Sequence, residues 1–115
     1  MKSSLAPNWR YISLRVQMAQ PLEEKRFGVE LVRALTWQIG VEGMQQTQAS
    51  VISYDPASTH LVLRCLRGSE RRLIASLALI PRVGEREAHL ESLKISGTLN
   101  HVQEKKKTHK SEKAE

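Results

Sequence analysis

Apolar positions between residues 59 and 80 predict a strand that runs through a short turn into a helix. From Thr59 to Leu66 most side chains are apolar, and Leu61, Leu63 and Cys65 share one face of the pleat. A strand covered in this way is typical of the interior of a sheet. Arg67-Gly68 then breaks the alternation and predicts the turn.

The helix after this turn is expected to begin at Ser69, whose hydroxyl can accept a hydrogen bond from a free N–H group of the first turn. Pro81 ends it because proline cannot continue a helix. Its apolar positions recur at helical spacing: Leu73, Ile74, Leu77, Ala78 and Ile80. A helix with one apolar stripe packs on the sheet that contains its preceding strand, so this unit should supply the core.

The first half of the chain shows the same order of elements. Alternation from Trp9 to Gln17 predicts a strand, and Pro21 suits the first position of a helix of about 18 residues. Gly40 and Gly43 are expected to end that helix. Trp37 lies off its stripe and is interpreted as a residue at the rim of the core rather than a platform for a ligand. The stripe consists of Phe27, Leu31, Val32, Leu35 and Ile39.

Two further strands complete the pattern. Gln45 to Tyr54 predicts a weaker strand, which a turn sequence joins to the central one as a hairpin. Arg82 to Glu87 is expected to form a charged loop. Leu90 to Ser96 then alternates again, with Leu93 and Ile95 pointing inward.

The predicted order, strand-helix-strand-strand-helix-strand (βαββαβ), favours an α+β fold of the ferredoxin-like, RNA-recognition type. Both helices should cover one face of an antiparallel sheet, and the other face is left for a tail, a second subunit or RNA. We expect a mobile arm over residues 1–8, one domain over 9–99 and a basic tail over 100–115, since 115 residues can bury a single core.

Composition limits the classes of function. Aromatic residues make up 4% of the chain, which is poor for a protein that reads single strands by stacking on many rings. Cys65 is the one cysteine, so an internal disulfide is excluded. No apolar run is long enough to cross a bilayer and no leader opens the chain, so we expect a soluble, intracellular protein without a membrane partner.

The net charge of +6 makes a polyanion a natural partner. Half of the excess lies in residues 105–115, a segment that could either contact nucleic acid or serve as a solubilising end. The four histidines show no pairing at metal-ligand spacing, and the connection from Met18 to Pro21 lacks the glycine loop of phosphate-cleaving enzymes. We therefore expect no catalytic residues and no bound metal in this chain.

Two clusters remain as candidate RNA-binding residues. Ser96-Gly97-Thr98 offers hydroxyls and a glycine where backbone could approach a phosphate or a 2′-OH, although the same residues suit a simple strand-ending turn. Arginines around the second helix could contact phosphates or form a solvated face. The basic candidates are Arg64, Arg67, Arg71, Arg72, Lys105, Lys106 and Lys107.

Four segments in order along residues 7–99 resemble the small protein subunit family of archaeal and eukaryotic ribonuclease P, called ribonuclease P protein component 2 in archaea. They are Arg10-Tyr11-Ile12, Leu63-Arg64-Cys65, Ala75-Ser76-Leu77-Ala78-Leu79-Ile80 and Leu93-Lys94-Ile95-Ser96-Gly97-Thr98-Leu99. The compact length looks more like the archaeal members.

This resemblance implies a ferredoxin-like protein that assists endonucleolytic removal of the 5′ leader of precursor tRNA, with the ribonuclease P RNA and its Mg²⁺ ions doing the chemistry. It also implies pairing with a barrel-shaped subunit, component 3, commonly as a heterotetramer, and contact of Ser96, Gly97 and Thr98 with the catalytic RNA. The compartment would be the archaeal cytoplasm, or the nucleus in a eukaryote. The residues alone leave two alternatives open: a ferredoxin-like module that pairs with proteins or senses a small molecule, and a small hydrolase.

Overall fold

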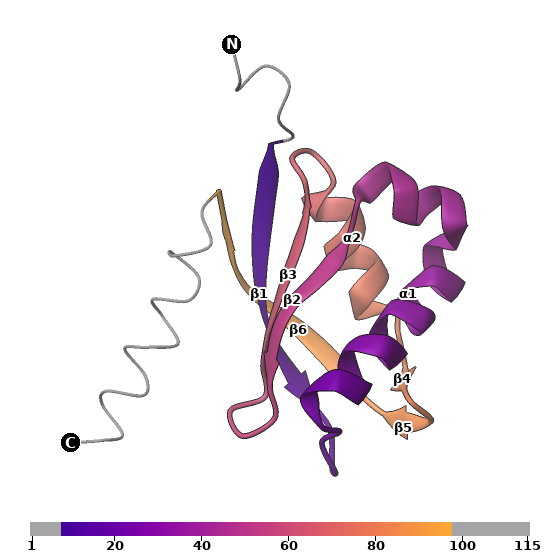
Figure 1. The fold of residues 1–115 in the computed structure, drawn as a ribbon, viewed down its shortest axis with the longest axis vertical. Coiled ribbons are helices and arrows are strands. Elements are labelled where there is room, and N and C mark those ends of the chain that lie inside the picture. The colour runs from indigo at the N-terminus through magenta and orange to yellow at the C-terminus, as the bar shows by residue number, and fades with distance from the viewer. Residues whose placement is uncertain (1–7, 98–115) are drawn as a thin grey trace, which may run out of the picture.

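The computed structural model describes residues 8–97 and consists of a four-stranded antiparallel sheet with two helices on one side (Figure 1). The strands lie in the order β2-β3-β1-β6, so the two strands that lead into the helices occupy the middle. The predicted α+β, ferredoxin-like class is confirmed. The elements are β1 (Trp9–Gln17), α1 (Glu24–Thr47), β2 (Ser50–Asp55), β3 (His60–Leu66), α2 (Glu70–Ala78), β4 (Arg82–Val83), β5 (Arg86–Glu87) and β6 (His89–Ser96).

The core lies between the sheet and the helices because one pleat face of both central strands is apolar. β1 supplies Ile12, Leu14 and Val16, and β3 supplies the predicted Leu61, Leu63 and Cys65, all at most 1% exposed. From α1, Phe27 stacks on Tyr54 of β2 with ring centroids 4.0 Å apart. Burial of each large side chain contributes about 1.5–3 kcal/mol, so this layer holds the sheet and helices in fixed register.

Helix α1 is longer than its glycines predict. Gly40 adopts φ 76° and ψ 170°, which breaks α1 into two helical segments, and the second segment buries Gly43 and Thr47. The expected end at Gly40 therefore corresponds to the end of the first segment, whereas the expected end at Gly43 was wrong because Gly43 lies inside the second. The following strand starts at Ser50 rather than Gln45, and the helix begins three residues after Pro21.

The start of α2 also differs from the prediction. Ser69 precedes the helix, but its side chain makes no capping hydrogen bond. The Gly68 N–H, in the turn before the helix, donates to Glu70 Oε1 at 2.5 Å, so this carboxylate ties the turn to the helix but caps no N–H of the first helical turn. After the helix, residues 82–87 form the short β4–β5 hairpin in place of the expected loop.

Four large apolar side chains placed by prediction at the core or its rim are exposed. Trp37 is 86% exposed, and Val32, Leu93 and Ile95 are 38%, 36% and 45% exposed. The register of β1 with β6 shifts between Ser13 and Leu14, which leaves Leu93 without an opposite residue. The inward orientation expected for Leu93 was wrong, whereas Ile95 lies opposite the buried Ile12 on the inward face, as predicted, and is exposed near the end of the edge strand.

Among residues 8–97, no helix has the length and hydropathy that crossing a membrane would need. The predicted basic tail, and the predicted N-terminal arm apart from Asn8, lie outside the described residues.

Candidate nucleic-acid interface

Three chain segments meet at the end of the sheet where β1 begins. β6 ends beside it, since Tyr11 lies opposite Ser96, and β3 ends there and turns into α2 (Figure 1). The backbone N–H of Arg67 donates to the carbonyl of Asn8 at 2.8 Å and ties the turn to the start of β1. The antiparallel topology thus brings together residues 8–11, 64–71 and 96–97.

Arg10 is a member of this site that the predicted site residues did not include. Its Nε lies 3.5 Å from Glu70 Oε2, and its guanidinium extends over Gly97. A Cβ at position 97 would collide with Nη1 of Arg10. A side chain at position 97 would displace the flexible end of Arg10, so the present position of this guanidinium depends on a glycine there. The sequence could have indicated Arg10, because it lies at the start of the first strand and directly precedes Tyr11, the residue opposite Ser96.

Arg64 lies on the other face of the sheet. Its Cζ sits 4.0 Å from the centroid of the Trp9 ring, which is a cation–π contact. Its Nε is buried and has no hydrogen-bond partner among the described residues. Since Arg10 faces the helices and Arg64 faces away from them, positive charge is presented on both sides of this end of the sheet.

The two adjacent arginines of α2 have different surroundings. Arg71 is exposed next to the β3–α2 turn, together with Arg67. Arg72 instead donates from Nη1 to Gln46 Oε1 in the last turn of α1 at 2.6 Å. The sequence grouped Arg71 with Arg72, and the structure separates them. Thr98, Lys105, Lys106 and Lys107 lie outside the described residues.

We call Arg10, Arg64, Arg67, Arg71, Ser96 and Gly97 the basic end. It contains four arginines, of which Arg10 is ion-paired with the carboxylate of Glu70. Guanidinium groups bind phosphate oxygens with two parallel hydrogen bonds, so this arrangement suits a phosphate backbone. Cys65 beneath it is fully buried, and burial followed by the charge of Glu70 raises the pKa of its thiol to about 11. This thiol stays neutral at physiological pH, so the basic end is suited to binding rather than to nucleophilic chemistry.

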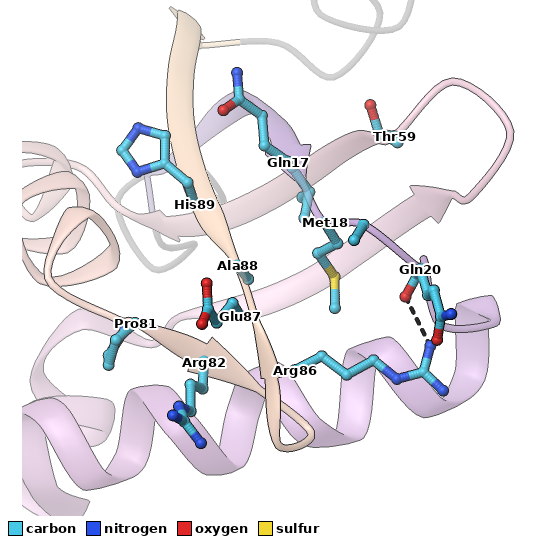
Figure 2. A pocket seen from close by; sticks show the side chains of 12 residues that line it. Gln17, Met18, Gln20, Thr59, Pro81, Arg82, Arg86, Glu87, Ala88 and His89 are labelled. Carbon is cyan, nitrogen blue, oxygen red and sulfur yellow. Dashed lines mark hydrogen bonds between the residues drawn. The ribbon is translucent and has the colours of Figure 1, made fainter.

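A pocket of about 1020 Å³ lies at the opposite end of the sheet, between the end of β1 and the β4–β5 hairpin (Figure 2). Arg86 crosses it and donates from Nη1 to the carbonyl of Gln20 at 2.7 Å. Arg82 and His89 line the pocket with Glu87. Its mixed charge makes it a weaker candidate for a polyanion than the basic end.

The fold and the basic end together define a small sheet-and-helix protein with a surface that fits RNA phosphates. The chain belongs to the Rpp14/Pop5 family, a family of ribonuclease P proteins, because the family's sequence profile matches residues 10–107. This confirms the resemblance to a ribonuclease P subunit family.

One solved structure shows the same fold. It is a chain in the cryo-EM structure of yeast ribonuclease MRP, with a TM-score of 0.64 and 16% sequence identity over 95% of this chain and 94% of that chain. A comparison with curated protein sequences finds no match.

Proposed function

We propose that this chain is the component 2 subunit and that the basic end is where it contacts the ribonuclease P RNA. As a member of the Rpp14/Pop5 family, the chain is a protein subunit of the ribonuclease P ribonucleoprotein, which removes the 5′ leader of precursor tRNA. The single observation that carries the contact site is the gathering of four arginines at one end of the sheet, where Glu70 holds Arg10 beside Gly97 and Trp9 holds Arg64.

The physical role proposed for this cluster is charge neutralisation. RNA segments repel one another through their phosphates, and each guanidinium that replaces a condensed counterion reduces that repulsion and gains the entropy of the released ion. The Glu70 carboxylate restricts Arg10 and the Trp9 ring restricts Arg64, so less side-chain entropy is lost on binding. The RNA then keeps its active fold at a lower Mg²⁺ concentration.

In this proposal the RNA subunit and its Mg²⁺ ions cleave precursor tRNA, and this chain binds no cofactor. The proposed protein partner is component 3, in a heterotetramer. The proposed compartment is the cytoplasm of an archaeal cell, or the nucleus if the host is a eukaryote.

Reconstitution tests the proposal. Ribonuclease P RNA from the same host is assayed for cleavage of precursor tRNA over a range of Mg²⁺ concentrations, with component 3 alone and with component 3 plus this chain. We expect this chain to lower the Mg²⁺ concentration that half-maximal cleavage needs. Failure of the chain to associate with the RNA, even in the presence of component 3, would contradict the proposed function.

A further inference from the structure

The side of the sheet that is turned away from α1 and α2 (Figure 1), which we call the helix-free face, has a buried centre. Val62 of β3 and Ser13 of β1 lie opposite each other there, and both are 0% exposed. Side chains alternate along a strand, and the adjacent Leu61, Leu63 and Ile12 belong to the core, so these two point away from it. They are thus shielded from solvent although neither described helix covers them.

The neighbouring side chains do not account for this burial. Across the sheet, Val62 is flanked by Ser53 of β2 and by Ser13, and a serine side chain is too short to cover a valine. Along β3, the guanidinium of Arg64 stacks on the tryptophan at the start of β1, and Nε2 of His60 lies 2.7 Å from Ser13 Oγ. Val62 therefore needs a cover from outside the sheet. Because these exposures are those of a single chain, that cover belongs to the chain itself.

Two segments of the chain lie outside the described residues and are candidates for this cover, residues 1–7 and residues 98–115. The first joins the domain at Asn8, whose carbonyl accepts a hydrogen bond from the Arg67 N–H at 2.8 Å, beside the β3–α2 turn. At about 3.3 Å per residue, Ser13 lies roughly 17 Å along β1 from this point. Residues 1–7 would have to reverse direction and extend over that distance, which makes them the poorer candidate.

Residues 98–115 leave the sheet much nearer to the buried centre. β6 ends at Ser96, which lies opposite Tyr11, and Tyr11 is on the helix-free face two residues before Ser13. The distance from there to Ser13 is about 7 Å at the rise of a strand. The family's sequence profile also begins at residue 10 and continues to residue 107, so it includes the start of this segment and none of residues 1–7.

The start of the C-terminal segment has the composition that an uncharged, buried centre needs. Residues 98–104 contain two apolar side chains, Leu99 and Val102, which are three positions apart. This spacing allows both to contact one surface from a single helical turn. The lysines at 105–107 come after it and would be a poor cover for Val62, because a buried ammonium group must lose its hydration.

We propose that residues 98–104 pack on the helix-free face, with Leu99 and Val102 over Val62. The face is then an internal docking site rather than an open sheet on which bases stack. The lysines at 105–107 are held close to the domain, which limits the entropy that they lose on contact with a phosphate backbone. The inference concerns the chain by itself and does not depend on the proposed function.

The test places a thiol at the centre of the helix-free face of the full chain and measures how fast N-ethylmaleimide alkylates it. In Val62→Cys the new thiol points away from the core, whereas the native Cys65 on the same strand points into the core and is 0% exposed. Alkylation at position 62 therefore reports loss of the cover, and alkylation of Cys65 reports opening of the strand itself. Mass spectrometry of peptides separates the two sites.

Two pairs of substitutions are compared in the Val62→Cys background. Leu99→Ser with Val102→Ser removes the apolar contacts, and the matched control, Asn100→Ser with Gln103→Ser, changes polar residues of the same segment. We expect the first pair to speed alkylation at position 62 by about 10-fold, because burial of its two apolar side chains is lost, and the control by less than about twofold. Cys65 should stay unreactive in both.

Four results would overturn the inference. They are equal alkylation rates in the two pairs, fast alkylation at position 62 beside an unaltered C-terminal segment, protection that grows with protein concentration, which would mark a second copy as the cover, and protection that requires added RNA. If a substitution opened the strand and exposed Cys65, the unaltered chain decides. Its nuclear Overhauser effects should connect the methyl groups of Val62 with those of Leu99 or Val102, and their absence would also overturn the inference.

Discussion

The basic end and the centre of the helix-free face lie on the same sheet but differ in chemistry. At the basic end, two of the four arginines are held in place by Glu70 and Trp9. At the centre of the helix-free face, Val62 and Ser13 carry no charge and are fully buried. The first surface suits a phosphate backbone, and the second suits apolar residues of the chain itself.

The largest loss of RNA affinity is expected when three arginines of the basic end are removed at once. Arg10→Ala, Arg67→Ala and Arg71→Ala together should weaken binding of ribonuclease P RNA by roughly 100-fold at ~0.1 M salt, because three phosphate contacts are lost. The matched control is the double variant Arg82→Ala, Arg86→Ala at the opposite end of the sheet. An equal loss of RNA affinity in this control, measured by filter binding, would show that the basic end is no special site.

A smaller effect is expected from filling the space at Gly97. Gly97→Val should push Arg10 away from the end of β6 and weaken RNA binding by about 10-fold, the equivalent of one charged hydrogen bond. Ser92→Val, an exposed position on the same strand, controls for the added β-branched side chain. Crystal structures of both variants would locate Arg10. Wild-type RNA affinity in Gly97→Val would contradict the role given to this glycine.

A comparison of two neighbouring arginines tests which residues of α2 belong to the basic end. We expect Arg71→Ala to lower RNA affinity by about fivefold, whereas Arg72→Ala should change it less than twofold, because Arg72 is bound to Gln46. Electrophoretic mobility shifts with both variants measure the difference. The opposite ranking of the two variants would mean that RNA approaches along α1.

The smallest effect concerns the strand beneath the basic end. The folded state raises the pKa of Cys65 from 9.0 to about 11, chiefly through burial, so the unfolded chain loses this proton at a lower pH than the folded chain does. The free energy of unfolding should therefore fall as the pH rises from about 9 to 11, by at most ~1.4 kcal/mol for each pKa unit of the shift. Urea unfolding of wild type and Cys65→Ala at pH 8 and 10.5 measures the contribution of Cys65 to the pH dependence of the free energy of unfolding. If the free energy of unfolding of the wild type fell no more between pH 8 and 10.5 than that of Cys65→Ala, the raised pKa of Cys65 would be contradicted.

The sequence predicted the strands whose apolar and polar residues alternate. The bounds of β1 match the expected Trp9–Gln17, and β3 starts one residue after the predicted Thr59. Local rules failed where tertiary contacts override them. Gly40 does break the helix, but a second helical segment that buries Gly43 and Thr47 follows it, and Leu93 lost its inward position to a register shift that no local pattern reveals.

The candidate site was predicted in part for the same reason. Ser96, Gly97, Arg64, Arg67 and Arg71 do come together, because antiparallel pairing brings the ends of β3 and β6 to the start of β1. Arg10 could be assigned only from the space that Gly97 leaves, and Arg72 only from its contact with Gln46. The exposure of Trp37 depends on which side of α1 faces the sheet, and the predicted position at the rim was wrong.

The salt dependence of RNA binding tests the separation of the two surfaces most directly. Log affinity for ribonuclease P RNA is plotted against log salt for the wild type, for the triple Arg10, Arg67 and Arg71 variant, and for the double variant Leu99→Ser, Val102→Ser. The triple variant should reduce the slope by roughly two to three units, at about 0.9 per phosphate contact, and the double variant should keep the wild-type slope because it removes no charge. An unchanged slope in the triple variant, or an equal reduction in both, would contradict the account.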